Sequence, residues 1–161
     1  MYLKLKHYIF GLVLLSGFFY IQAQTVEYGG LKWYTDFEKA KKTAIKENKN
    51  IVILFTGSDW CRPCMALKKE VFPNKIFKEY AQQTVLVLAD FPRRKKLPEE
   101  QVKTNRKLAS QFLRSGGFPT MVGIDPESEE IISTIVGYNF IKHDIQPHIS
   151  FIKKIVEFNK N

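Results

Sequence analysis

Two cysteines separated by two residues are the groups in this sequence that could do covalent chemistry. Cys61 and Cys64 are the only cysteines of the chain, and they lie in the stretch SDWCRPCMALKKEV, which follows the apolar run NIVILFTG. A pair of thiols at this spacing can form a reversible redox centre, a permanent structural disulfide or half of a metal site. The rest of the sequence separates these three interpretations.

The predicted position of the pair favours the redox interpretation. Cys61 follows an apolar strand and opens a helix, where unpaired backbone N–H groups and the positive end of the helix dipole stabilise a thiolate. Such motifs lower the pKa of a cysteine below its usual ~8.5. We therefore expect Cys61 to be exposed and to attack a substrate disulfide, and Cys64, more buried, to resolve the mixed disulfide. Trp60 is expected to form part of an apolar collar around the pair.

The two other interpretations of the cysteines fit the sequence less well. A bridge between residues three apart closes a very small loop, so its entropic stabilisation lies at the low end of the disulfide range. Zinc would need two more ligands, and the candidates His143 and His148 are far from any short zinc spacing. A copper-handling protein, with the soft thiols as ligands, stays an alternative.

The first 23 residues predict a secretory signal peptide. Lys4 and Lys6 precede an apolar run from Tyr8 to Ile21, and Ala23 is a small residue suited to cleavage. The run is shorter than the ~20 residues that span a bilayer, although a retained N-terminal anchor stays the alternative. We therefore expect an exported, periplasmic protein with one domain over residues 24–161. In an oxidising compartment a thiol pair becomes a disulfide unless something reduces it.

Composition agrees with one globular domain and argues against nucleic-acid binding. The chain is 45% hydrophobic and 14% aromatic, which is enough apolar surface for an ordinary core. The net charge of +9 is spread along the chain, with one cluster at Arg93–Lys96. No basic stripe carries aromatics placed to stack on bases. The cluster is interpreted as a solvated loop or as a docking surface for an acidic partner.

The elements that must position the cysteines alternate between helices and strands. Residues 24–30 are expected to be exposed and irregular, and the last two strands to pair antiparallel across a short turn. Helices that join successive strands predict a mostly parallel sheet covered on both faces. Apolar spacing predicts helices over residues 33–49, 61–68, 76–83, 98–114 and 141–156, and strands over 51–57, 84–91, 120–124 and 131–138.

These motifs resemble the thioredoxin superfamily, and in particular small exported bacterial thioredoxin-like proteins with a WCxxC motif. The resemblance rests on DWCRPC after an apolar strand and on GGFPT, DFPR and GY further along, and it covers residues 33–158. It implies a thioredoxin-like α/β fold, with a central mixed β-sheet flanked by helices on both faces. It also implies that Pro119 follows a cis peptide bond and packs against the cysteines, and that Phe118 offers backbone hydrogen bonds to a substrate.

The resemblance further implies a thiol–disulfide oxidoreductase that reduces or isomerises disulfides of envelope proteins. Its partners would be protein disulfide or dithiol substrates and a membrane thiol electron donor or acceptor, with no dissociable cofactor. The alternative is a thioredoxin-fold binding or chaperone-like module, or a copper-handling protein, in which the cysteines are secondary. The chain departs from cytoplasmic thioredoxins because Leu54 and Phe55 stand where those carry a buried aspartate. Asp59 is the nearest carboxylate and is expected to be a loop or helix-cap residue.

Overall fold

The computed structural model describes residues 25–114 and 116–158, so the predicted signal peptide lies outside the described residues. Over this range none of the helices is long and apolar enough to cross a membrane. The elements in chain order are β1 (Thr25–Tyr28), β2 (Leu31–Tyr34), α1 (Phe37–Glu47), β3 (Ile51–Thr56), α2 (Arg62–Glu70), α3 (Lys75–Ala81), β4 (Val85–Asp90), α4 (Glu99–Phe112), β5 (Thr120–Ile124), β6 (Ile131–Val136) and α5 (Gln146–Phe158).

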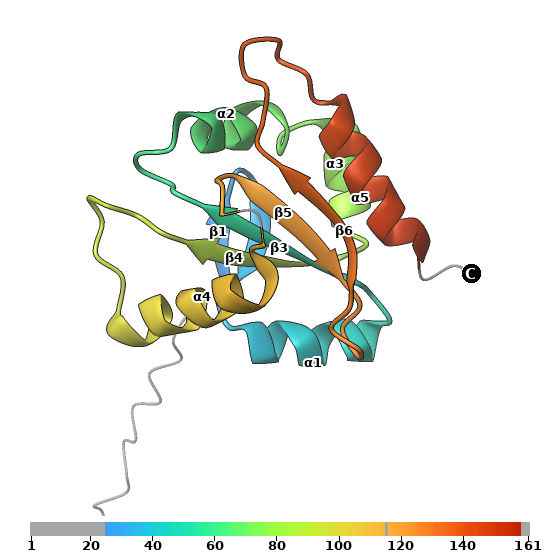
Figure 1. Cartoon of the computed structure of the whole chain (residues 1–161). Helices are drawn as coiled ribbons and strands as arrows, with labels where there is room; N and C mark the ends of the chain where they lie inside the picture. Colours follow the sequence, from blue (N-terminus) through green and yellow to red (C-terminus); the bar gives the residue numbers. More distant parts are fainter. Residues whose placement is uncertain (1–24, 115, 159–161) are drawn as a thin grey trace, which may run out of the picture.

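The described strands form one mixed six-stranded sheet with the order β1-β2-β4-β3-β5-β6 (Figure 1). The prediction of a mostly parallel sheet is wrong, because only β2 with β4 and β4 with β3 pair in parallel. β5 begins beside the end of β3 that leads to the cysteines. Thr120 therefore pairs with Phe55, and β5 runs antiparallel to β3. The predicted antiparallel pairing of the last two strands is confirmed.

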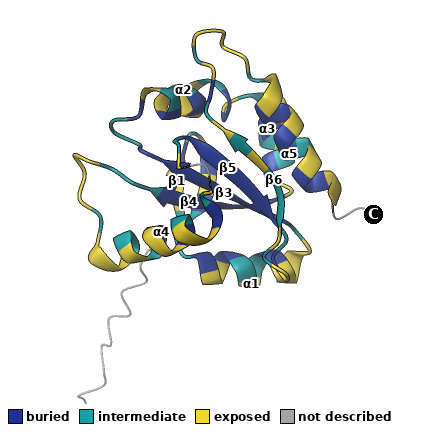
Figure 2. Cartoon of the chain, viewed as in Figure 1, coloured by how far each residue is buried: buried dark blue, intermediate teal, exposed yellow. Residues whose placement is uncertain are grey.

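Helices cover both faces of the sheet, as predicted, and β3 is buried at every position and apolar from Ile51 to Phe55. Ile51, Ile53 and Phe55 belong to a core with α1 and α4, whereas Val52 and Leu54 belong to a core with α2, α3 and α5. Successive side chains of a strand point to opposite faces, so one continuous apolar run supplies both cores. Figure 2 shows the central strands buried while each helix exposes its outer side.

The N-terminal region differs from the prediction, because residues 25–34 form a β-hairpin. Gly29 and Gly30 have φ values of 64° and 72° and form its tight turn. Trp33 lies in β2 with none of its surface exposed, and its indole N–H donates to the carbonyl oxygen of Tyr28 at 2.8 Å. The helix predicted from residue 33 instead begins at Phe37, after the cap Asp36. Leu31 and Trp33 are buried and Lys32 between them is exposed, which is the alternation typical of a strand.

The C-terminal helix is shorter than predicted. It begins at Gln146 rather than residue 141, and Pro147 lies in its first turn, where a missing N–H is tolerated. Ile141 belongs to the loop before the helix, and 80% of its surface is exposed. The apolar spacing that predicted the helix therefore extends beyond its true start.

Candidate active site

The two cysteines form a disulfide at the carboxyl end of β3. The sulfur atoms are 2.06 Å apart and the Cα atoms 5.2 Å apart. Cys61 is the N-cap of α2: its Sγ accepts the backbone N–H of Cys64 at 3.3 Å, and Pro63 lies in the first turn. An amide at a helix N-terminus therefore points at the first sulfur, as expected from the sequence.

The burial of Cys61 differs from the prediction. Only 5% of its surface is exposed in the disulfide form, against 1% for Cys64, so Cys61 is not an exposed residue although it is the less buried of the two. The bond to Cys64 holds its side chain on the first turn of α2. Its own N–H is also bound, by the carbonyl oxygen of Gly57 at 3.0 Å.

Trp60 lies half-buried directly before the disulfide, over Gly57. Its indole N–H donates to the carbonyl oxygen of Phe91 at 2.8 Å. A Cβ atom added to Gly57 would lie 2.5 Å from the indole ring, so the ring can occupy this position only above a glycine. The backbone of Gly57 and the hydrogen bond to Phe91 therefore fix the position of the indole ring.

Three aromatic rings form a surface beside the disulfide, which we call the aromatic wall: Trp60, Phe91 and Phe118. The rings of Trp60 and Phe118 meet edge-on with centroids 6.0 Å apart, and those of Phe91 and Phe118 are stacked at 5.3 Å. Phe91 was not singled out in the sequence. Because the carboxyl ends of the parallel strands β3 and β4 meet at one edge of the sheet, its position directly after β4 could have indicated it.

The cis peptide bond that the resemblance implied before Pro119 is present. The Phe118–Pro119 peptide bond is cis, and Pro119 directly precedes the pairing of Thr120 with Phe55 at the end of β3. The carbonyl oxygen of Pro119 accepts the N–H of Gly137 at 2.7 Å. The tertiary structure thus brings Trp60, Phe118 and Pro119 to the same end of the sheet as the cysteines.

Two carboxylates bind the loops that follow β3 and β4. Asp90 accepts the N–H of Ser58 at 2.9 Å and its hydroxyl at 2.6 Å. Asp59 accepts three backbone N–H groups, from Arg93 at 2.9 Å, Arg94 at 2.8 Å and Lys95 at 2.9 Å. These bonds, with that from Arg93 foremost, lower the pKa of Asp59 below its ordinary value. Asp59 is thus a loop anchor.

The loop after β6 contacts both ends of α2. The guanidinium of Arg62 lies 5.9 Å from the centroid of the Phe140 ring. Glu70 accepts a hydrogen bond from the hydroxyl of Tyr138 and lies 2.9 Å from Nδ1 of His143. His148 is buried with its ring edge-on to Tyr138. The exposed His143 therefore pairs with Glu70 and the buried His148 packs on Tyr138. No group of three or more potential metal ligands occurs among the described residues.

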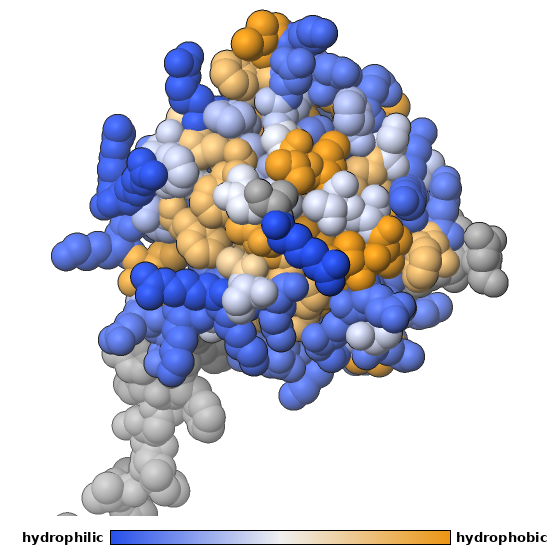
Figure 3. Space-filling view, viewed as in Figure 1, coloured by the Kyte–Doolittle hydropathy of each residue, from blue (hydrophilic) through white to orange (hydrophobic). Residues whose placement is uncertain are grey.

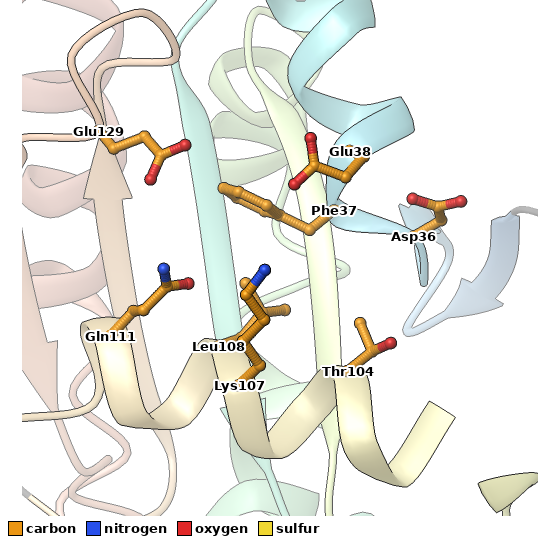
Figure 4. Close-up of a pocket in the computed structure, with 8 residues that line it drawn as sticks. All are labelled: Asp36, Phe37, Glu38, Thr104, Lys107, Leu108, Gln111 and Glu129. Atoms are coloured by element: carbon orange, nitrogen blue, oxygen red, sulfur yellow. The ribbon is translucent and has the colours of Figure 1, made fainter. Parts of the chain in front are cut away.

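A separate pocket of about 230 Å³ lies between α1 and α4, away from the cysteines (Figure 4). Two of its carboxylates already have partners: Asp36 caps α1, and Glu129 pairs with Lys41. None of its lining residues is a cysteine or a member of the aromatic wall. Covalent chemistry in the described residues is therefore centred on the disulfide, which can exchange electrons by attack of a thiolate on a sulfur.

Comparison with known proteins agrees with this geometry. The chain is 32% identical to the "Disulfide bond reductase DsbH" of Chlamydia pneumoniae over 111 residues, which are 68% of this chain and 66% of that protein. It is 26% identical to the "Thioredoxin-related protein DsbJ" of the same organism over 110 residues, 68% of this chain and 31% of that protein. The matched part is less than two thirds of the length of either relative.

Solved structures share the fold. One described as "DsbH Oxidoreductase" superposes with a TM-score of 0.66 at 27% identity, covering 79% of this chain and 85% of that chain. The thioredoxin from Aeropyrum pernix superposes with a TM-score of 0.56 at 16% identity, covering 82% and 92%. The family model of the thioredoxin-like domain matches residues 37–151, and the resemblance noted in the sequence is confirmed: the chain belongs to the thioredoxin-like family.

Proposed function

We propose that this protein is an exported thiol–disulfide oxidoreductase that reduces or isomerises the disulfides of other envelope proteins. The observation that carries the proposal is the Cys61–Cys64 disulfide at the N-terminus of α2, beside the aromatic wall. The reductive direction is supported by the sequence similarity to a protein named as a disulfide bond reductase.

In the reductive direction the thiolate of Cys61 attacks one sulfur of a substrate disulfide. The substrate S–S bond breaks, its second sulfur leaves as a thiolate that takes up a proton, and a mixed disulfide with Cys61 forms. The thiolate of Cys64 then attacks the sulfur of Cys61. This step releases the remaining substrate thiol and forms the Cys61–Cys64 disulfide that the structure contains. Two electrons pass from the cysteine pair to the substrate.

The substrate polypeptide lies in this proposal against Trp60, Phe118 and Pro119. Phe118 and Pro119 directly precede β5, which pairs with β3, the strand that leads to the cysteines. An extended polypeptide that lies there meets an apolar wall and the backbone of Phe118. No cofactor is needed, because the electrons move between sulfur atoms.

The oxidised pair must be reduced again for a second turnover. We propose a membrane thiol protein as the electron donor, and an oxidase as acceptor if the cycle runs in the opposite direction. We also propose that residues 1–23 are a signal peptide and that the protein works in the periplasm. Mass spectrometry of protein from the periplasmic fraction should then give an N-terminus at Gln24; an intact N-terminus in the membrane fraction would contradict cleavage.

Equilibration with glutathione of known ratio tests the direction of electron flow. Thioredoxin-fold pairs range from about −270 mV to about −120 mV, which is ~7 kcal/mol of equilibrium preference. A reductase should lie nearer the first value and should reduce a disulfide-bonded protein catalytically with dithiothreitol as donor. If the pair exchanges with glutathione but catalyses no reduction, the chain is a binding module with secondary thiols.

A further inference from the structure

We propose that a basic groove beside the aromatic wall binds acidic segments of the substrate polypeptide. The inference rests on the proposed oxidoreductase function and adds a class of substrate to it. The groove has a volume of about 410 Å³ and lies between the loop after β4 and α4. Its main lining residues are Phe91, Arg93, Lys95, Lys96, Val102 and Arg106.

The charges of the basic groove have few partners among the residues that the structure describes. Four basic side chains line it against one carboxylate, Asp90, which already accepts two hydrogen bonds from Ser58. Among the ion pairs of the described residues, none involves a side chain of Arg93–Lys96 or Arg106. The next acidic residues along the chain, Glu99 and Glu100, are exposed in the first turn of α4 and do not line the groove. The groove can therefore attract an external anion.

The loop that carries these charges is held in place. The carboxylate of Asp59 accepts the backbone N–H groups of Arg93, Arg94 and Lys95, which are consecutive. The Arg93 guanidinium lies 3.8 Å from the centroid of the Trp60 ring. A binding surface that is already ordered loses less conformational entropy when a partner binds. A loop that served only as a solvated connection would not require these contacts.

The basic groove and the redox site share residues. Phe91 lines the groove, stacks on Phe118 and accepts the indole N–H of Trp60. Arg93 lines the groove and covers Trp60. Figure 3 shows long hydrophilic side chains at the left edge of the molecule, where Figure 1 places the loop between β4 and α4, beside hydrophobic surface. A polypeptide with its disulfide at Cys61 therefore passes next to the groove.

The lining of the groove favours a polypeptide as occupant. Phe91, Leu97 and Val102 provide apolar surface between the basic side chains. An extended peptide with mixed acidic and apolar residues can use both kinds of surface, whereas an anionic lipid surface would use only the charges. The redox site next to the groove takes a polypeptide in the proposed function. We therefore assign the groove to acidic segments near substrate disulfides.

Binding of cysteine-free peptides to the oxidised protein tests the inference without any redox step. Two extended peptides of equal length are compared, one with four glutamates and one with glutamines in their place. The fluorescence of Trp60, which Arg93 contacts, reports binding. At low salt the glutamate peptide should bind about tenfold more tightly, and about 0.5 M NaCl should remove the difference by screening.

Two charge-reversed proteins with equal net charge locate the effect. The first is R94E/K95E/K96E, which leaves Arg93 on Trp60. The matched control is K46E/K75E/K154E, on exposed positions of α1, α3 and α5. The first variant should lose the preference for the glutamate peptide, and the control should keep it. Equal binding of both peptides to the unmodified protein, or loss of the preference in both variants, would overturn the inference.

Two further measurements distinguish peptide binding in the groove from the redox step and from binding to a membrane. If the peptides bind as expected but no protein disulfide is reduced, the groove stands and the proposed catalytic function fails. Vesicles with and without about one third anionic lipid test the membrane alternative. Vesicle binding that R94E/K95E/K96E abolishes, together with no preference between the peptides, would assign the surface to lipid and overturn the proposal.

Discussion

The two cysteines differ in their surroundings, and this difference bears on their roles. The sulfur of Cys61 accepts a backbone N–H at the start of α2, which favours its thiolate when the bond is reduced. Cys64 lies within the first turn and is almost fully buried. We therefore expect a substrate sulfur to reach Cys61 first.

The assigned roles predict different trapping by two variants. Cys64→Ser should accumulate mixed disulfides with envelope proteins, because the resolving thiol is absent and the complex with Cys61 cannot break down. Cys61→Ser should trap none. Non-reducing electrophoresis after acid quenching measures the adducts. Equal trapping by the two variants would mean that the attacking sulfur is wrongly assigned.

Gly57 is expected to control the position of Trp60. Gly57→Ala places a methyl group 2.5 Å from the indole, so the ring must leave its hydrogen bond to Phe91. We expect a loss of about 1–3 kcal/mol in the free energy of unfolding and a shift in tryptophan fluorescence. Gly117→Ala is the control, because its Cβ would meet Val136 at an ordinary 3.6 Å. Equal unfolding midpoints in urea would contradict this prediction.

On the scale of the elements, the packing of α5 is expected to depend on pH. His148 lies in the first turn of α5 with 3% of its surface exposed. Burial lowers the pKa of His148 to about 4, although a backbone hydrogen bond with Gly137 and the charge of Asp144 favour protonation. The ring of Tyr138 packs edge-on against it. Protonation of His148 therefore works against the packing of α5.

The free energy of unfolding should accordingly fall as the pH decreases from about 6.5 to about 4. In this window the unfolded chain binds a proton at His148 that the folded protein excludes, so stability increases with pH. The pKa difference corresponds to at most about 3 kcal/mol. Urea unfolding at several pH values measures the slope. His148→Leu should reduce the slope; an unchanged slope in this variant would refute the assignment.

On the scale of the whole molecule, the fold depends on the two cores and little on the disulfide. The cores on the two faces of the sheet bury nearly all of β3, β4 and β5. The disulfide links residues only three apart. Closing so small a loop limits the conformational entropy of the unfolded chain only slightly.

Reduction should therefore leave the protein folded. We expect dithiothreitol to lower the free energy of unfolding by about 2 kcal/mol or less, with an unchanged far-UV circular dichroism spectrum. Urea unfolding of the oxidised and reduced proteins measures this difference. Loss of the fold on reduction would show that the disulfide is a structural staple, which would contradict a redox role.

Local features of the sequence determined which segments are helices and strands around the site. The apolar run of β3, the cysteines that open α2 and the proline before β5 were all visible, because each depends on neighbours within a few residues. The cap of α1 at Asp36 and the first-turn position of Pro147 in α5 likewise depend on residues close in sequence. The thioredoxin-like fold and its cysteine site followed from these motifs through the resemblance.

Contacts between distant residues were decided only by the tertiary structure. The pairing of β2 with β4, the antiparallel direction of β5 and the burial of Cys61 depend on partners far along the chain. The same holds for the contact of Arg93 with Trp60, because β4 must first pair beside β3. A sequence period records which face of an element is apolar. It does not record which element will cover that face. The cysteine motif could therefore be identified from the sequence, whereas the residues that surround it could not.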